Sequence, residues 1–307
     1  MKKVLVTDSL FIYPEHEAMM LQAGIIIERL DKPCATENEL VAAIKDKDGY
    51  ILGGIEKVTK PVISAGSNLK AISFTGTAWK GFVPAWQFAA QEGIKITNAP
   101  HANASAVAEW AFTTSLAMAR NLFDLGRTGK GSFKTTAGLS DLKIGIIGMG
   151  HIGSRIGELF EAVGAKSVSY WNRSTIDSIF EYKDIPDILS SSNIIFVCVS
   201  SEAGCDFLDD EKLSLLEEGS VITCLTDSVI DESALLSHLK SGKVRAFLDW
   251  TPALSDFKQL PLDSFYCSNE STAFNTKAAN QLASDIVTQS MINILSNKND
   301  SYIVNAL

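Results

Sequence analysis

Three glycines stand close together in the segment IGIIGMGHIGSRIGELF. Gly148, Gly150 and Gly153 lie between an apolar run typical of a buried strand and a run typical of a helix. At this spacing the first glycine permits a tight turn, the second lets the backbone approach a ligand, and the third lets the helix pack on the strand. Amides and the dipole at a helix N-terminus favour an anion. The segment therefore predicts a diphosphate site that includes His151 and Ile152; the alternative is a purely structural turn.

The next apolar run, SVSYWNRS, ends where a dinucleotide-binding domain reads the adenosine ribose. Sites that prefer NAD carry Asp or Glu about 20 residues after the glycine loop. This chain has Asn172, Arg173 and Ser174 there. Each can donate a hydrogen bond to a 2′-phosphate, and arginine can also neutralise one. The residues favour NADP over NAD as cofactor, with Arg173 as a solvated turn residue the alternative.

A third candidate junction is ITCLTDSVIDESALL, which reads as a buried strand, a polar loop and a helix start. The loop offers Thr226, Asp227 and Ser228, and no cation. Strand-to-helix loops of α/β proteins carry ligands and catalytic groups. This loop can offer a neutral hydrogen bond, which is weaker than a charge-assisted pair between a guanidinium and a carboxylate.

The elements that must position these residues alternate between strand and helix. In the first hundred residues we expect strands at 2–7, 25–30, 49–54, 69–76 and 95–100. Helices are expected between them at 14–24, 36–46, 59–67 and 83–93. Thr36 and Glu39 have the spacing of a capping box. Such alternation predicts a parallel sheet covered on both faces.

The second half begins with an expected single helix of about 25 residues at 103–127 and an irregular segment at 128–141. A second α/β series follows. Its apolar runs of strand length lie at 142–147, 167–171, 193–200, 220–225 and 244–250. A last helix is expected at 276–297. The whole chain is thus long enough for two domains of ordinary size.

Composition excludes some classes of function. The 307 residues are 46% hydrophobic and carry a formal net charge of −9, which argues against a nucleic-acid-binding face. No apolar run of about 18 residues predicts a membrane span, and the N-terminus reads as a strand rather than a signal peptide. The five cysteines lack metal-ligand spacing and are expected to be reduced core thiols of a cytoplasmic protein.

The order of parts resembles the D-isomer-specific 2-hydroxyacid dehydrogenases. The resemblance spans nearly the whole chain and rests on LKAISFTGTAW, GIKITNAPHANASAVAEW, LKIGIIGMGHIGSRI and VIDESALLSHLKSGKVRAFLDW. It implies an α/β fold of two Rossmann-like domains with parallel sheets. A dinucleotide-binding domain at 103–275 would be inserted into a discontinuous substrate domain at 1–102 plus 276–307. It also implies a homodimer, paired through the helix from about Asn103 and the loop after it.

The family's three catalytic positions are replaced in this chain. Matching by local motif places Thr226 where the family has Arg, Leu254 where it has Glu, and Glu270 where it has His. The family's Arg binds the substrate carboxylate and its His exchanges the proton. The segment from 249 to 274 contains no histidine, so a shift in the alignment does not restore one.

Other positions of the family motif are retained. The resemblance implies that Asp249 accepts from the nicotinamide carboxamide and that Ser105 lies near the cofactor. The substrate's acidic group would meet the backbone amides of Gly76, Thr77 and Ala78. No metal site is expected.

New chemistry would fall to Glu270, Lys80 and Thr226. Glu270 could serve as a general acid or base, or be a solvated residue at a helix start. Lys80 could bind an acidic group or donate a proton, or be an exposed loop lysine. Trp79 could stack on a flat substrate or pack between domains. His101 could reach the cleft, although a surface or capping role is the simpler interpretation.

Three functions follow from these patterns. The first is an NAD(P)-dependent reductase of a small molecule that is not a simple 2-oxo acid, such as a ketone or imine. The second is a non-catalytic protein that responds to the bound dinucleotide. The third is an ordinary 2-hydroxyacid dehydrogenase in which a cation such as Lys80 replaces the missing Arg. The absence of a charge run or an evident tail favours an enzyme.

Overall fold

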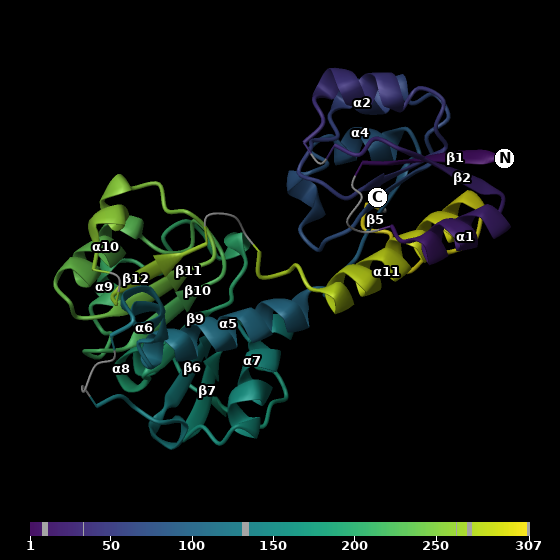
Figure 1. The fold of residues 1–307 in the computed structure, drawn as a ribbon. Helices are drawn as coiled ribbons and strands as arrows, with labels where there is room; N and C mark the ends of the chain where they lie inside the picture. The colour runs from purple at the N-terminus through teal and green to yellow at the C-terminus, as the bar shows by residue number, and fades with distance from the viewer. Residues whose placement is uncertain (8–11, 33, 131–134, 262, 269–271, 306–307) are drawn as a thin grey trace. The chain divides into compact units, whose positions relative to one another are not determined.

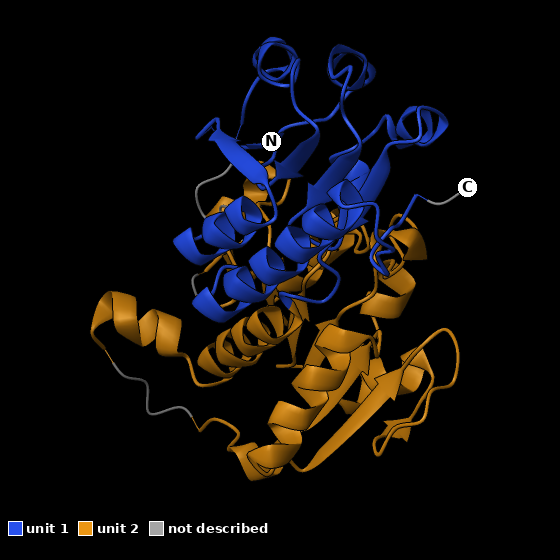
Figure 2. Ribbon diagram, turned by 90° about the vertical axis from the view of Figure 1, so that its right-hand side faces the viewer, with its two compact units in different colours: residues 1–103, 275–307 blue, residues 104–274 orange. Residues whose placement is uncertain are grey.

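The computed structural model describes residues 1–7, 12–32, 34–130, 135–261, 263–268 and 272–305 (Figure 1). The chain forms two compact units (Figure 2). Unit 1 comprises residues 1–103 and 275–307, and unit 2 comprises residues 104–274. Each unit contains one parallel sheet, which confirms the expected α/β class. The functional roles expected for the two parts of the chain stay predictions.

Unit 1 is a five-stranded sheet of order β2-β1-β3-β4-β5. Its strands are β1 (Lys2–Val6), β2 (Ile25–Arg29), β3 (Gly49–Leu52), β4 (Ala71–Phe74) and β5 (Lys95–Asn98). Its helices are α1 (Pro14–Gln22), α2 (Glu37–Ala43), α3 (Lys60–Ala65), α4 (Trp86–Gln91) and α11 (Lys277–Leu295). Helices α1 and α11 pack together on one face, and α2, α3 and α4 cover the other. The inner strands β3 and β4 are buried along their whole length because helices cover both faces of the sheet.

Two local predictions for unit 1 are confirmed. The hydroxyl of Thr36 accepts from the amide of Glu39 at 3.4 Å, and the amide of Thr36 donates to the Glu39 carboxylate at 2.8 Å. This reciprocal pair starts α2. The last helix is also present, although it is shorter than expected at both ends.

Three buried polar side chains, those of Thr7, Tyr50 and Glu56, form a hydrogen-bonded cluster beside β1 and β3. The hydroxyl of Tyr50 donates to the carboxylate of Glu56 at 2.9 Å, and Thr7 bonds to both side chains. Burial, together with the neighbouring Glu56 carboxylate, raises the pKa of Tyr50 well above its ordinary value. These bonds fix the start of the loop that follows β3.

Unit 2 is a seven-stranded parallel sheet of order β12-β11-β10-β9-β6-β7-β8. Its strands are β6 (Lys143–Ile147), β7 (Ser167–Trp171), β8 (Glu181–Tyr182), β9 (Ile194–Val197), β10 (Val221–Cys224), β11 (Arg245–Leu248) and β12 (Phe265–Cys267). Its helices are α5 (Ala104–Ala119), α6 (Leu122–Thr128), α7 (His151–Ala162), α8 (Ile185–Ser191), α9 (Asp210–Leu213) and α10 (Glu232–Lys240). Apolar side chains of α5 and α7 join one core layer, and those of α8, α9 and α10 join the other.

The expected single helix at 103–127 is wrong, because it is broken into α5 and α6. Asn121 adopts the left-handed conformation with φ of 56°, which asparagine tolerates better than most residues. The guanidinium of Arg245 donates to the Met118 carbonyl at 2.6 Å and to the Asn121 side chain at 3.0 Å. A residue far along the chain therefore satisfies the end of α5 and stabilises the break.

The expectation that all five cysteines are core thiols is also wrong. Cys224 is buried in β10 and Cys198 follows β9, but Cys34 and Cys205 are exposed. Burial raises the pKa of the Cys224 thiol to about 12, so that thiol stays protonated at neutral pH.

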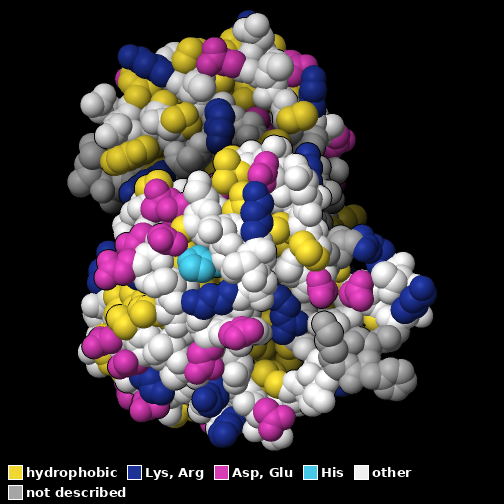
Figure 3. Space-filling model, turned by 90° about the vertical axis from the view of Figure 1, so that its left-hand side faces the viewer, with side chains coloured by type: hydrophobic (Ala, Val, Ile, Leu, Met, Phe, Trp, Pro, Cys, Tyr) yellow, Lys and Arg dark blue, Asp and Glu magenta, His cyan; other side chains and the backbone are white. Residues whose placement is uncertain are grey.

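In the described part of the chain, no helix has the length and apolarity to cross a membrane. Acidic and basic side chains are interspersed over the face in Figure 3.

Candidate cofactor site

The carboxyl edge of the unit 2 sheet carries the glycine loop after β6, residues 172–174 after β7, Thr226 after β10 and Asp249 after β11. The strand order reverses between β6 and β9, so the loops that follow these strands diverge to opposite faces. The amide of Cys198 donates to the Ile147 carbonyl at 2.8 Å, which keeps the two strand ends side by side. Ligands of open parallel sheets bind at such a reversal point.

The three glycines of the loop differ in what surrounds them. Gly148 has a φ of 103°, and a Cβ there would lie 2.8 Å from the Cys198 carbonyl carbon. A Cβ on Gly153 would lie 2.2 Å from the Gly148 carbonyl oxygen. A Cβ on Gly150 would meet no atom of the described residues within 4 Å. The first and third glycines are thus required by packing, whereas the second leaves open space beside the backbone.

Helix α7 begins directly at this loop. Gly150 is its N-cap, so no side chain at that position competes for the amides of the first turn. His151 is exposed at the first helical position, and Ile152 is half-buried against the core beneath it. The loop therefore offers an anion the helix N-terminus and an uncovered stretch of backbone.

Of the three residues after β7, one forms hydrogen bonds within the protein and two are exposed. Asn172 accepts from the Met149 amide at 3.2 Å and donates to the Ser174 carbonyl at 3.0 Å, so it ties this loop to the glycine loop. Arg173 and Ser174 are exposed. Within the described residues, Arg173 has neither an ion pair nor a side-chain hydrogen bond. Its guanidinium is therefore available to a ligand, while the Asn172 amide is already committed.

Thr226 lies in the loop after β10, next to the end of β9. Its hydroxyl donates to the Val199 carbonyl at 2.8 Å, and its own carbonyl accepts from the Cys224 thiol at 3.4 Å. Asp227 and Ser228 are exposed in the turn that follows. The one O–H donor of Thr226 is therefore already used in a hydrogen bond within the protein, so its hydroxyl can only accept a hydrogen bond from a ligand.

The end of β11 contributes a buried carboxylate. Asp249 is 7% exposed and accepts from the Ser268 hydroxyl at 3.0 Å. The segment after it is held by Glu232, which accepts from the Trp250 indole at 3.2 Å and from the Ala253 amide at 2.9 Å. Glu232 was not predicted as a positioning residue, because its place beside an N-cap indicates only a favourable interaction with the helix dipole.

The remaining predicted positions are less informative. Leu254 is 37% exposed at the start of a short 3₁₀ helix. Glu270, the first catalytic candidate, lies outside the described residues. Ser105 is exposed in the first turn of α5. The described residues contain no cluster of His, Cys, Asp and Glu that could hold a metal ion.

The predicted substrate-binding residues lie on unit 1, after β4. The Thr77 carbonyl accepts from the Asn98 side chain at 2.9 Å, and the Thr77 hydroxyl accepts from the His101 amide at 3.2 Å. His101 has a φ of 63°, a conformation that favours glycine. Gly76 is half-buried, and Ala78 is exposed.

Lys80 and Trp79 face different environments. Both belong to a short 3₁₀ helix at Trp79–Gly81, and Lys80 is exposed. Trp79 is 7% exposed and meets Trp86 edge-on, with ring centroids 6.0 Å apart. The ring is thus part of the unit 1 core, so its expected use in stacking on a substrate is wrong, whereas packing between domains stays a prediction.

Comparison with known proteins identifies the sequence family. The family model described as D-isomer specific 2-hydroxyacid dehydrogenase, NAD binding domain, matches residues 111–263. Hydroxypyruvate reductase of Thermotoga maritima is 31% identical over 218 residues, which cover 68% of this chain and 71% of that protein. D-3-phosphoglycerate dehydrogenase of Synechocystis is 29% identical over 279 residues, or 85% of this chain. The match spans only 47% of that longer relative.

Solved structures show the same fold. A Thermus thermophilus protein aligns with a TM-score of 0.87 at 18% identity, over 98% of this chain and 99% of its own. An acyclic imino acid reductase in complex with NADPH and D-Arg aligns with a TM-score of 0.82 at 21% identity, over 99% of this chain and 100% of its own. Together with the sequence matches, these findings show that the chain belongs to the D-isomer specific 2-hydroxyacid dehydrogenase family, a family of nicotinamide-dependent oxidoreductases with a Rossmann-like fold.

Proposed function

We propose that this protein is an NADPH-dependent reductase of a small carbonyl or imine compound other than a simple 2-oxo acid. The observation that carries the proposal is the state of Thr226. At the position where the family resemblance expects an arginine, the chain presents a neutral hydroxyl that already donates to the Val199 carbonyl. This residue does not supply the paired N–H donors that hold a carboxylate.

The carboxyl edge of unit 2 is the proposed cofactor site. The open space at Gly150 and the start of α7 would receive the diphosphate, with His151 and Ile152 beside it. Arg173 and Ser174 would bind the 2′-phosphate, and Asn172 would hold that loop in place. Ser105, Thr226 and Asp249 complete the proposed contacts. When bound, the dihydronicotinamide supplies a hydride.

The remaining chemistry falls to side chains of this chain. Reduction of a carbonyl or imine needs one proton at the oxygen or nitrogen, and Lys80 and Glu270 are the proposed donors. The backbone after β4, at Gly76, Thr77 and Ala78, would bind the polar end of the substrate. An imine is consistent with the fold, because the acyclic imino acid reductase shares it.

Replacing the second and third glycines by alanine separates cofactor binding from folding. Gly150→Ala is expected to leave the melting temperature nearly unchanged while raising the Kd for NADPH about tenfold or more, because its methyl group would stand in the open space proposed for the diphosphate. Gly153→Ala is expected to destabilise the fold by about 1–3 kcal/mol, because its Cβ would collide with the Gly148 carbonyl. Thermal unfolding and fluorescence titration measure both effects.

The matched control for these variants is Gly138→Ala, whose added Cβ would make only an ordinary contact at 3.5 Å with the Asp141 carboxylate. It should change neither cofactor affinity nor the integrity of unit 2. Tight NADPH binding by Gly150→Ala would show that the diphosphate does not lie on this loop.

Arg173 determines the expected preference for NADPH. Arg173→Ser should weaken NADPH binding about 10- to 100-fold and leave NADH binding nearly unchanged, because only NADPH carries the phosphate that the guanidinium would bind. Competitive titration with the two nucleotides measures the ratio. Lys166→Ser is the control, since Lys166 is an exposed cation just before the other end of β7. Equal loss of both nucleotides in Arg173→Ser would contradict the assignment.

The substrate class is tested by initial rates of NADPH oxidation. Glyoxylate, pyruvate and hydroxypyruvate should react at least about 100-fold more slowly, in kcat/KM, than the best of a panel of ketones and preformed imines. Lys80→Met should lower kcat on that best substrate, because it removes a proposed proton donor. Lys70→Met, an exposed lysine just before the amino end of β4, is the control. Rapid turnover of any of the 2-oxo acids would refute the proposed substrate class.

We also propose a homodimer that pairs through α5 and α6. The seven-residue helix α6 buries none of its residues, and Leu122 and Leu125 are 52% and 42% exposed. Leu125→Glu should shift the protein to monomers in light scattering after gel filtration, because it puts a charge into an apolar interface. Leu282→Glu, at a similarly exposed leucine of α11, should not. A wild-type protein that is monomeric at micromolar concentration would contradict this proposal.

A further inference from the structure

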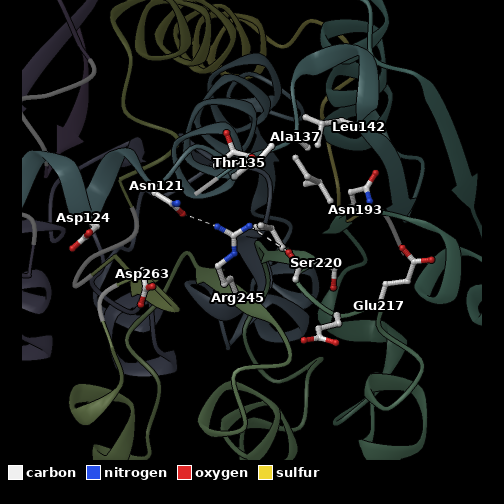
Figure 4. Close-up of a pocket in the computed structure, with 16 residues that line it drawn as sticks. Asn121, Asp124, Thr135, Ala137, Leu142, Asn193, Glu217, Ser220, Arg245 and Asp263 are labelled. Atoms are coloured by element: carbon white, nitrogen blue, oxygen red, sulfur yellow. Dashed lines mark hydrogen bonds between the residues drawn. The ribbon is translucent and has the colours of Figure 1, made fainter. Parts of the chain in front are cut away.

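A cavity of about 490 Å³ lies at the amino edge of the unit 2 sheet (Figure 4). The end of α5, the start of α6 and the first residues of β9, β10 and β11 line it. This edge is the opposite end of the strands from the glycine loop. The volume is within the range of small-molecule sites.

Arg245 is the cation of this cavity and has no carboxylate partner among the described residues. Its guanidinium donates to the carbonyls of Met118 and Gly219 and to the Asn121 side chain, all of which are neutral acceptors. A guanidinium has five N–H donors, so at least two remain beyond these three bonds. Burial lowers the pKa of Arg245, although nearby Asp263 opposes that effect. A half-buried cation with spare donors favours an anionic group beside it.

Ser220 provides independent evidence for a ligand. Its side chain is 3% exposed and lines the cavity, and its buried hydroxyl has no hydrogen-bond partner among the described residues. A buried hydroxyl without a partner costs free energy that a ligand acceptor would recover. Ser220 immediately follows Gly219, whose carbonyl accepts from Arg245 at 3.3 Å. The Ser220 hydroxyl and the Arg245 guanidinium therefore offer hydrogen-bond donors close to one another.

The rim of the cavity has the opposite charge. Its carboxylates are Asp124, Glu217, Glu218 and Asp263. A simple anion would meet this excess of negative charge, and a simple cation would leave Arg245 and the Ser220 hydroxyl unsatisfied. A molecule that carries both charges satisfies both sets of groups.

We propose that this cavity binds a small zwitterion of the α-amino acid class. Its carboxylate accepts from Arg245 and from the Ser220 hydroxyl, and its ammonium group faces the surrounding carboxylates. The site is separate from the proposed cofactor site, so its occupancy does not depend on the proposed cofactor. Asn121 and Asp124 lie next to the α6 surface proposed for the homodimer, so the proposal requires a dimer that leaves the cavity open.

Calorimetric titration of the full chain with individual L- and D-amino acids tests the proposal. Alanine is the simplest probe, with propionate as the anion-only control and ethylamine as the cation-only control. At least one amino acid should bind with saturation at least tenfold more tightly than both controls. Absence of binding by every amino acid, or binding of propionate as tight as that of alanine, would overturn the proposal.

Two variants of cavity residues test whether the amino acid binds in this cavity. Ser220→Ala should keep the melting temperature and weaken the amino acid about tenfold, because it removes a hydrogen bond to a charged group. Asp263→Asn should weaken the amino acid and strengthen propionate, which a purely structural role would not cause. NADPH affinity should be unchanged in both, which verifies the fold.

A second copy of this chain could fill the cavity instead. In that event the variants would change the oligomeric state and no amino acid would bind, which would also overturn the proposal. Unaltered amino acid affinity in both variants would place the binding elsewhere and reject this cavity as the site.

Discussion

The close contact between α7 and the turn that ends β6 is the constraint on which the site in unit 2 depends. Gly153 lies so close to the Gly148 carbonyl that any side chain would force the two apart. This contact holds the N-terminus of α7 beside the ends of β6 and β9. Asn172 and Thr226 then attach the neighbouring loops to the same edge through the Met149 amide and the Val199 carbonyl. The candidate site is thus assembled mostly from backbone groups held in place by short polar side chains.

The two edges of the unit 2 sheet differ in chemistry. The carboxyl edge offers amide donors, an exposed guanidinium at Arg173 and a buried carboxylate at Asp249, which suits a phosphorylated cofactor with an amide group. The amino edge offers one half-buried guanidinium, at Arg245, within a rim of carboxylates. The same strands support both edges. Unchanged binding at one edge therefore shows that a substitution at the other edge has left the sheet folded.

Local patterns predicted most of the fold. Apolar runs bounded by turns and the Thr36–Glu39 capping box act over a few residues, and these expectations are confirmed. The sequence could not predict the break at Asn121, because it depends on Arg245, which lies more than a hundred residues further along the chain. The inward rotation of Trp79 onto Trp86 similarly depends on tertiary packing.

The candidate site was predictable to the extent that it follows the glycine pattern and the strand ends. The position of Asp249 at the end of β11 and of Thr226 after β10 could be read from the apolar runs before them. The part played by Glu232 could not, because its carboxylate acts on the Trp250 indole and the Ala253 amide from another element. Contacts of this kind between distant residues leave no periodic signal in a sequence.

Hydrogen–deuterium exchange of the unmodified protein with and without NADPH locates the cofactor on the chain. We expect slower exchange at the amides of 149–154 and 172–174, where the diphosphate and the 2′-phosphate would lie. No change is expected at 217–221, at the opposite edge of the sheet. Binding of NADPH without protection of the glycine loop would contradict the assignment of the carboxyl edge of unit 2 as the cofactor site.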